Sequence, residues 1–138
     1  VCIYSMTSTE IIVDLVGYFA PTGLSYLPTS PSRLLDTRET TGYLAMASAV
    51  SYRPAVASLG AYSAVAASVN VTAVDHTTAG YVTTYDCATR TTTSAVNAVV
   101  GQVNANGAIV PLVNGLDSCL FTQSGGNLVV DLNGWWVR

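Results

Sequence analysis

The end of this chain repeats a stretch near its beginning. Residues 128–136 read Leu-Val-Val-Asp-Leu-Asn-Gly-Trp-Trp, and residues 11–19 read Ile-Ile-Val-Asp-Leu-Val-Gly-Tyr-Phe. The match continues upstream without a gap, because Cys2 corresponds to Cys119 at the same offset of 117 residues (119 − 2 and 131 − 14). The same offset relates a cysteine, an aspartate, a glycine and a pair of aromatic residues in the two stretches. Such a match is hard to obtain by chance and indicates a repeat protein.

The repeat divides the chain into two parts. Residues 1–22 are predicted to be the closing hairpin of a preceding repeat together with a linker. Residues 23–138 are predicted to form one complete repeat, which is long enough to bury a core of its own. A two-stranded hairpin is at best marginally stable alone in water, so we expect residues 1–20 to pack against something.

Alternating apolar and polar residues favour an all-β fold. Residues 61–74 alternate well, although their alanines leave a helix possible over 61–68. Residues 10–19 carry two largely apolar faces, which is typical of a central strand. An edge or loop segment is expected over 24–33, because its prolines cannot donate to a sheet. Further strands are predicted over 1–6, 33–38, 43–52, 81–85, 95–100, 108–113, 118–123 and 127–137.

Seven to nine short strands separated by turns predict an antiparallel β-sandwich, either Ig-like or jelly-roll-like, with a duplicated β-hairpin at the N-terminus. Only 9% of the residues are charged, lysine is absent, and the net charge is −3. Binding to nucleic acid or to anionic membranes needs clustered basic residues, so no nucleic-acid partner is expected. No stretch is apolar for long enough to predict insertion into a membrane.

The three cysteines are an odd number with a simple explanation. Cys87 and Cys119 each lie in or beside a predicted strand of the complete repeat, whereas Cys2 occupies the position of Cys119 in the earlier copy. One disulfide per repeat, Cys87–Cys119, would leave Cys2 without its partner, and would indicate an oxidising, extracellular setting. The alternative is three buried free thiols, which pack as small apolar groups.

Catalytic and metal-binding patterns are weak. His76 is the only histidine and is expected to be a solvated turn residue, so a hydrolase of the usual kind lacks its base and orienting carboxylate. Asp75 or Asp117 could ligate Ca²⁺ through loop oxygens, but no known ligand spacing is present. We therefore expect no enzyme, no resident metal and no cofactor.

A carboxylate on a central strand needs a partner. Asp131 lies in such a strand, and an unpaired charge there would be costly. Arg33 and Arg38 flank another apolar segment and are the expected partners. We predict a structural ion pair between these residues, and a ligand contact by the same arginines is the alternative.

Two aromatic pairs are the candidates for binding. Neighbours in a strand point to opposite faces, so one ring of Trp135 and Trp136, and one ring of Tyr18 and Phe19, faces the core while the other faces outward. An outward ring could cover the junction with another repeat. Alternatively it could stack on a sugar, with Tyr43 as a further platform residue.

The repeated motifs resemble a known family. The stretches VVDLNGWW and IIVDLVGYF resemble the VVDVTGYF repeat of secreted and cell-surface proteins of actinobacteria, and the stretch PTSPSRLLDTR resembles the RLLDTR segment that opens each unit there. The resemblance implies non-catalytic, β-rich tandem modules of exported proteins without a defined ligand. It also implies pairing of Cys87 with Cys119.

These observations predict a non-catalytic structural or adhesive repeat module that is secreted or displayed on a cell surface. Residues 1–20 could lie on their own unit, or could insert into a neighbouring molecule that lacks its closing hairpin. Repeated head to tail, that contact does not close and would build a filament. The alternative function is a carbohydrate-binding module that attaches a secreted protein or a cell to polysaccharide.

Overall fold

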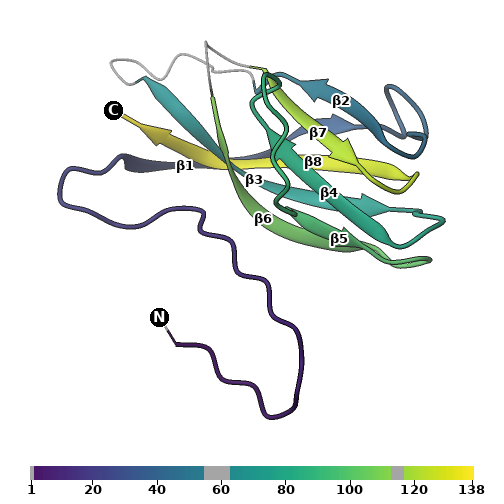
Figure 1. The fold of residues 1–138 in the computed structure, drawn as a ribbon. Helices are drawn as coiled ribbons and strands as arrows, with labels where there is room; N and C mark the ends of the chain where they lie inside the picture. Colours follow the sequence, from purple (N-terminus) through teal and green to yellow (C-terminus); the bar gives the residue numbers. More distant parts are fainter. Residues whose placement is uncertain (1, 55–62, 113–116) are drawn as a thin grey trace.

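Two antiparallel four-stranded sheets pack face to face in the computed structural model, which describes residues 2–54, 63–112 and 117–138 (Figure 1). The predicted all-β sandwich is therefore confirmed. In chain order the strands are β1 (Ser25–Asp36), β2 (Ser48–Tyr52), β3 (Ala64–Val74), β4 (Gly80–Tyr85), β5 (Val96–Ala98), β6 (Asn104–Pro111), β7 (Ser118–Thr122) and β8 (Asn127–Val137).

The order of the strands gives the last two a special place. One sheet has the order β1-β8-β3-β6 and the other has the order β2-β7-β4-β5. β7 and β8 follow each other in the chain, yet they lie in different sheets, and each is flanked by a strand on both sides. β8 therefore connects β1 to β3 in one sheet, and β7 connects β2 to β4 in the other.

The core lies between the sheets, where small and branched side chains meet. In β3, Val69 and Val71 point inward and are fully buried, as the alternation predicts. The segment 64–68 is strand rather than helix, because it pairs with both β6 and β8. From β8 and β7, the inward residues are Leu128, Val130, Leu132, Trp135, Val137 and Leu120.

The first strand is an edge strand, as the prolines predict. Pro28 and Pro31 lie within β1, and the pairing of β1 with β8 is interrupted between Pro28 and Ser32. An edge strand tolerates this interruption because one of its sides has no partner strand to satisfy. The strand continues to Asp36 and so includes most of the predicted 33–38 segment.

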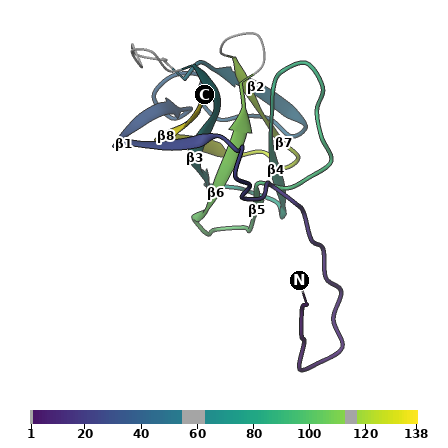
Figure 2. The same cartoon turned by 90° about the vertical axis from the view of Figure 1, so that its left-hand side faces the viewer.

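The strands predicted over residues 1–6 and 10–19 are not formed. Residues 2–20, called the arm below, have no strand pairing and project from the sandwich as an extended, doubled-back segment (Figures 1 and 2). The positions that the same residue pattern occupies in the sandwich are already filled by β7 and β8, and two strands without a third are marginal in water. Within the described residues there is no helix long and apolar enough to cross a membrane.

Candidate assembly site

The arm and the segment formed by β7 and β8 are two copies of one pattern in opposite surroundings. This segment is called the closing hairpin below, although the expectation of a paired hairpin is wrong, because its two strands lie in different sheets and do not pair with each other. In the closing hairpin, β8 pairs with β1 on one side and with β3 on the other. Leu128 and Val130 are fully buried there. Their counterparts in the arm, Ile11 and Val13, are 50% and 66% exposed. The arm thus presents, in extended form, the apolar face that a central strand buries.

Both copies have a glycine at the same position, and in the closing hairpin this glycine lies very close to β1. A Cβ atom built on Gly134 would lie 2.6 Å from the Tyr26 hydroxyl and 2.7 Å from the Leu27 carbonyl oxygen, both on β1. No larger residue fits there without moving the backbone of β1. Gly17 holds the equivalent place in the arm, with no other atom within contact distance of a Cβ. Contacts within the arm therefore give no steric reason for this glycine, and only its backbone φ of 157° favours it there.

The expected ion pair is present in modified form. Arg33 on β1 donates to the Asp131 carboxylate on β8 at 2.5 Å, and donates to Asp36 at 2.8 Å. Arg38 contacts Asp36 at 2.6 Å rather than Asp131. The Arg38 hydrogen bonds, together with Arg33, lower the pKa of Asp36 from 3.8 to about 2. Asp36 was not among the expected partners, although the two flanking arginines were a usable signal.

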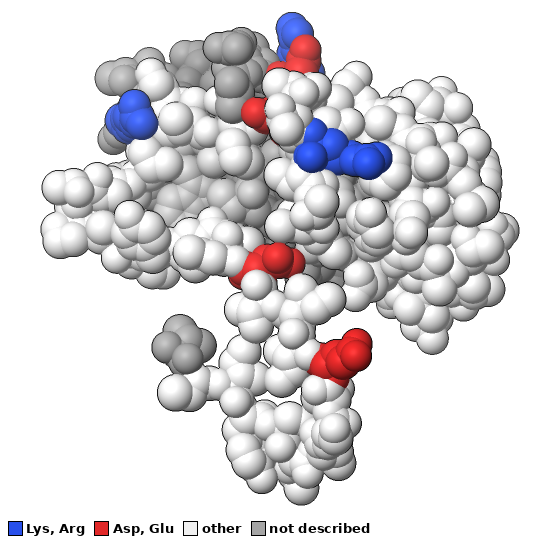
Figure 3. Space-filling view, in the orientation of Figure 1, with Lys and Arg blue, Asp and Glu red and all other residues white. Residues whose placement is uncertain are grey.

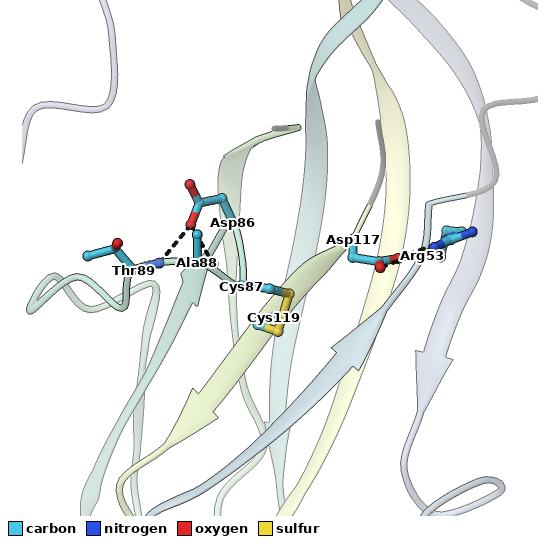
Figure 4. Close-up of a disulfide and its surroundings, with 7 residues drawn as sticks. All are labelled: Arg53, Asp86, Cys87, Ala88, Thr89, Asp117 and Cys119. Carbon is cyan, nitrogen blue, oxygen red and sulfur yellow. Dashed lines mark hydrogen bonds and ion pairs between the residues drawn. A yellow bond between two sulfur atoms is a disulfide. The ribbon is translucent and has the colours of Figure 1, made fainter. Parts of the chain in front are cut away.

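The disulfide Cys87–Cys119 fixes the loop after β4 onto the closing hairpin (Figure 4). Asp86 accepts hydrogen bonds from the backbone N–H groups of Ala88 and Thr89, which shapes the start of this loop. Cys2, the arm's copy of Cys119, is exposed and free. A disulfide is compatible with an extracellular protein.

The loop that follows this disulfide covers the outer face of β7. The Arg90 guanidinium lies 3.9 Å from the centre of the Phe121 ring, a cation–π geometry that the sequence did not reveal. Thr83 of β4 donates to the Thr93 carbonyl oxygen at 2.7 Å. The protein's own loop consequently covers the outer face of this sheet over β4 and β7, whereas Ala49 and Ser51 of β2 stay exposed.

The two tryptophans point to opposite sides of β8, as predicted. Trp135 is buried in the core, whereas Trp136 lies half-buried on the outer face of the other sheet. The Trp136 ring lies beside Tyr26, with 5.1 Å between ring centres. Tyr43 does not join this pair and instead contacts Thr77 near the turn of the closing hairpin.

The root of the arm lies next to this outer tryptophan. Residues 16–20 of the arm, with Gly23 and Leu24, line one side of an apolar pocket of about 310 Å³. Trp136, Ala66 and Ile109 line the other side. Tyr18 and Phe19 thus come near the outward Trp136, but remain largely exposed. The predicted aromatic candidates are brought together here, except for the buried Trp135 and for Tyr43. The expectation that one ring of Tyr18 and Phe19 faces the core is wrong, because both rings are exposed.

The histidine is buried, contrary to the expectation of a solvated turn residue. His76 is only 2% exposed, and its Nδ1 lies 2.8 Å from the Ser124 hydroxyl in the turn of the closing hairpin. Burial lowers the pKa of His76 below its ordinary value of 6.5. A Cβ on Gly126 would lie 2.5 Å from the imidazole, so the ring fills the space beside this turn. His76 and Ser124 are 48 residues apart in sequence, so only the folded structure shows that they are in contact.

Charge and metal ligands are sparse across the described molecule. The face seen in Figure 3 carries few charged groups, and those on the projecting arm are acidic. Among residues 2–54, 63–112 and 117–138, no three His, Cys, Asp or Glu side chains gather closely enough to hold a metal ion. Asp117, one of the considered Ca²⁺ ligands, instead accepts from Arg53 at 2.7 Å (Figure 4).

Comparisons with known proteins found no matching protein-family model, no matching curated protein and no matching solved structure.

Proposed function

We propose that the protein is a non-catalytic structural module of an extracellular assembly, and that its arm supplies the closing strands of another sandwich unit. The observation that carries this proposal is the equivalence between the exposed arm and the closing hairpin, which fills an interior position in each sheet. Donation of strands to an incomplete sheet is an established mode of recognition, in which backbone hydrogen bonds give affinity and alternate side chains give specificity.

The arm carries the features that the position of β8 requires. Gly17 allows the close approach to β1 that Gly134 allows in the unit described. Asp14 corresponds to Asp131, so it would meet an arginine at the position of Arg33. Ile11, Val13 and Leu15 would occupy the places of the buried Leu128, Val130 and Leu132. The gain in burial is large because these side chains are exposed in the free arm.

Serial joining follows from this arrangement. A module that closes one unit with its arm, while being a complete sandwich itself, links two sandwiches through the short segment between Phe19 and Ser25. Repetition of this contact requires units that lack their own closing strands and carry an arm; a series of such units does not close on itself and builds a linear array, which the complete unit described here would end. This is the type of architecture that the resemblance to the VVDVTGYF repeats implies for exported surface proteins.

The test mixes the intact chain with residues 23–117 carrying His76→Ala, which contain β1 to β6, lack the closing hairpin and leave space for Thr9 of the arm. The intact chain should capture this fragment into a complex of defined mass in light scattering. The matched control is the chain that begins at Gly23, because it retains its own closing hairpin and lacks only the arm. Equal capture by both chains, or no loss of capture with Gly17→Val, would refute donation by the arm.

The second candidate function is binding of carbohydrate, favoured by the half-exposed Trp136 beside Tyr26. The two rings are tilted by 46° to each other, so one of them could lie flat on a sugar ring. Polysaccharide binding that is abolished by Trp136→Ala, with unfolding of the variant unchanged, would support this function. Binding that is unaffected by Trp136→Ala and by loss of the arm would remove it.

A further inference from the structure

We propose that the arm binds a related sandwich that has a small residue at the position of His76, and that the turn within the arm prevents the arm from binding copies of the unit described here. This inference rests on the proposed function of the arm and names its partner. The evidence lies in the turn that joins the two strands of each copy. In the closing hairpin this turn is Ser124-Gly125-Gly126-Asn127, whereas in the arm it is Thr7-Ser8-Thr9-Glu10.

The first mismatch is steric. Thr9 corresponds to Gly126, where a Cβ atom would lie 2.5 to 2.6 Å from three atoms of the His76 ring. In the unit described, the imidazole is 2% exposed and hydrogen-bonded to the Ser124 hydroxyl, and Thr7 of the arm carries a hydroxyl at the position of Ser124 that would hold the ring in the same place. Overpacking of this kind destabilises a well-packed site by about 1–3 kcal/mol.

A second and a third mismatch lie beside the first. Ser8 corresponds to Gly125, where a Cβ atom would lie 2.9 Å from the Tyr43 hydroxyl oxygen and 3.2 Å from the Leu44 carbonyl oxygen. Glu10 corresponds to Asn127, which is 9% exposed and accepts a hydrogen bond from Thr37 at 3.0 Å. A carboxylate placed there would lose much of its hydration. The turn of the arm therefore disagrees with this unit at three consecutive positions.

The mismatch matters because the arm can reach its own unit. Ala20 corresponds to Val137, and Val137 pairs with Ser25 at the start of β1. The backbone N–H of Gly23 donates to the Ala20 carbonyl oxygen at 3.0 Å, so a turn already joins the arm to β1. Without a discriminating feature, the arm could replace β8 as the neighbour of β1. The turn residues discourage that replacement within one chain and between identical copies.

The partner is thereby defined by its chemistry. It is a sandwich of the same architecture whose closing strands are absent, with an arginine at the position of Arg33 for Asp14. It has a cysteine at the position of Cys87, which would pair with Cys2 as Cys87 pairs with Cys119 here. It has a small side chain at the position of His76, which leaves space for Thr9.

The disulfide pairing in the intact chain shows whether the arm or the closing hairpin occupies the interior strand positions of the sandwich. The reduced chain is refolded in a buffer of reduced and oxidised glutathione, where each protein disulfide forms as two cysteine thiols are oxidised and one oxidised glutathione becomes two thiols. Trypsin cleaves only after arginine here, and the Arg90 cleavage separates Cys87 from Cys119. Mass spectrometry then distinguishes Cys87–Cys119 from Cys2–Cys87, and light scattering distinguishes pairing within a chain from pairing between chains.

Three chains are compared: the natural chain, the turn-matched chain Ser8→Gly/Thr9→Gly/Glu10→Asn, and His76→Ala. The turn-matched changes lie in the exposed arm, so the sandwich itself is unaltered. We expect little Cys2–Cys87 in the natural chain, and an increase of about tenfold or more in each of the other two, because 1.4 kcal/mol corresponds to tenfold. Adding Gly17→Val to the turn-matched chain should return the fraction to the natural level.

The outcomes separate the two proposals. An equal, substantial Cys2–Cys87 fraction in the natural and turn-matched chains would overturn selection by the turn, while leaving donation by the arm intact. If the turn-matched chain forms no Cys2–Cys87, the comparison is repeated with Gly134→Val added to weaken the closing hairpin. Absence of the arm's disulfide there as well would overturn both proposals.

Discussion

The closing hairpin and the arm carry nearly the same residues in the same order, and only one of them is folded into a sheet. Val130 in β8 is fully buried between β1 and β3, whereas the identical Val13 in the arm is 66% exposed. Asp131 meets Arg33, and Cys119 meets Cys87. The corresponding Asp14 and Cys2 project with the arm. Preference for the strand conformation is thus equal in the two copies, and the available neighbours decide the outcome.

The comparison shows that each sheet of the unit has one interior position for a strand of this pattern. A second copy of an apolar hairpin in the same chain is a hazard, since it can displace the first or pair with another molecule. The unit described here holds its own copy by a disulfide, an ion pair and a packed turn. The arm is therefore available for an incomplete partner.

The largest expected difference concerns the cysteines. Cys87→Ser/Cys119→Ser removes a crosslink between residues 32 apart in sequence, which should lower the free energy of unfolding by about 3–4 kcal/mol. Cys2→Ser should leave it unchanged. Urea denaturation of the two variants measures the difference. A comparable loss in Cys2→Ser would mean that the arm already contributes to the stability of the sandwich.

The next difference concerns the two glycines. Gly134→Val places side-chain atoms against Tyr26 and the backbone of β1, and should lower the free energy of unfolding by about 3 kcal/mol. Gly17→Val, its matched control, should have no effect on the isolated chain. The same denaturation experiment serves here. A tolerated Gly134→Val would show that β1, an edge strand, moves aside at low cost.

A smaller difference separates two identical valines. Val130→Ala removes two buried methyl groups and should lower the free energy of unfolding by about 2 kcal/mol. Val13→Ala should leave the isolated chain unchanged, and should weaken only the capture of a fragment that lacks its closing hairpin. Thermal unfolding and the capture experiment together measure both effects. If Val13→Ala does not affect capture, the arm is not bound as a strand.

The smallest expected effect depends on pH. Burial lowers the pKa of His76 in the folded state, so the neutral form stabilises the fold. This contribution is complete above pH 6.5 and is lost as the pH falls from there through the lower folded value. His76→Gln should remove that part of the pH dependence, measured by urea denaturation between pH 5 and 8. The chain that begins at Gly23 should retain it, because the imidazole contacts the closing hairpin and not the arm.

The strands could be predicted from the sequence because alternation is a local property. Alternation over 61–74 predicted β3, whereas the match between the two copies predicted the strand over 127–137 and the pairing of Cys87 with Cys119. The unfolded arm could not be predicted, because its residues are those of β8 and the number of available positions is a property of the whole sandwich. The burial of His76 was also hidden, since it depends on Ser124 and Gly126, which are distant in sequence.

The central places of β7 and β8 have a consequence for the order in which the unit folds. Before residues 118–137 are available, β1 has no neighbour in its sheet and β2 has none in the other; only the β3–β6 and β4–β5 pairs can form. β1 and β8 are joined across about a hundred residues, and such long-range pairing is slow. A growing chain would therefore stay largely unstructured until the final strands of the unit emerge.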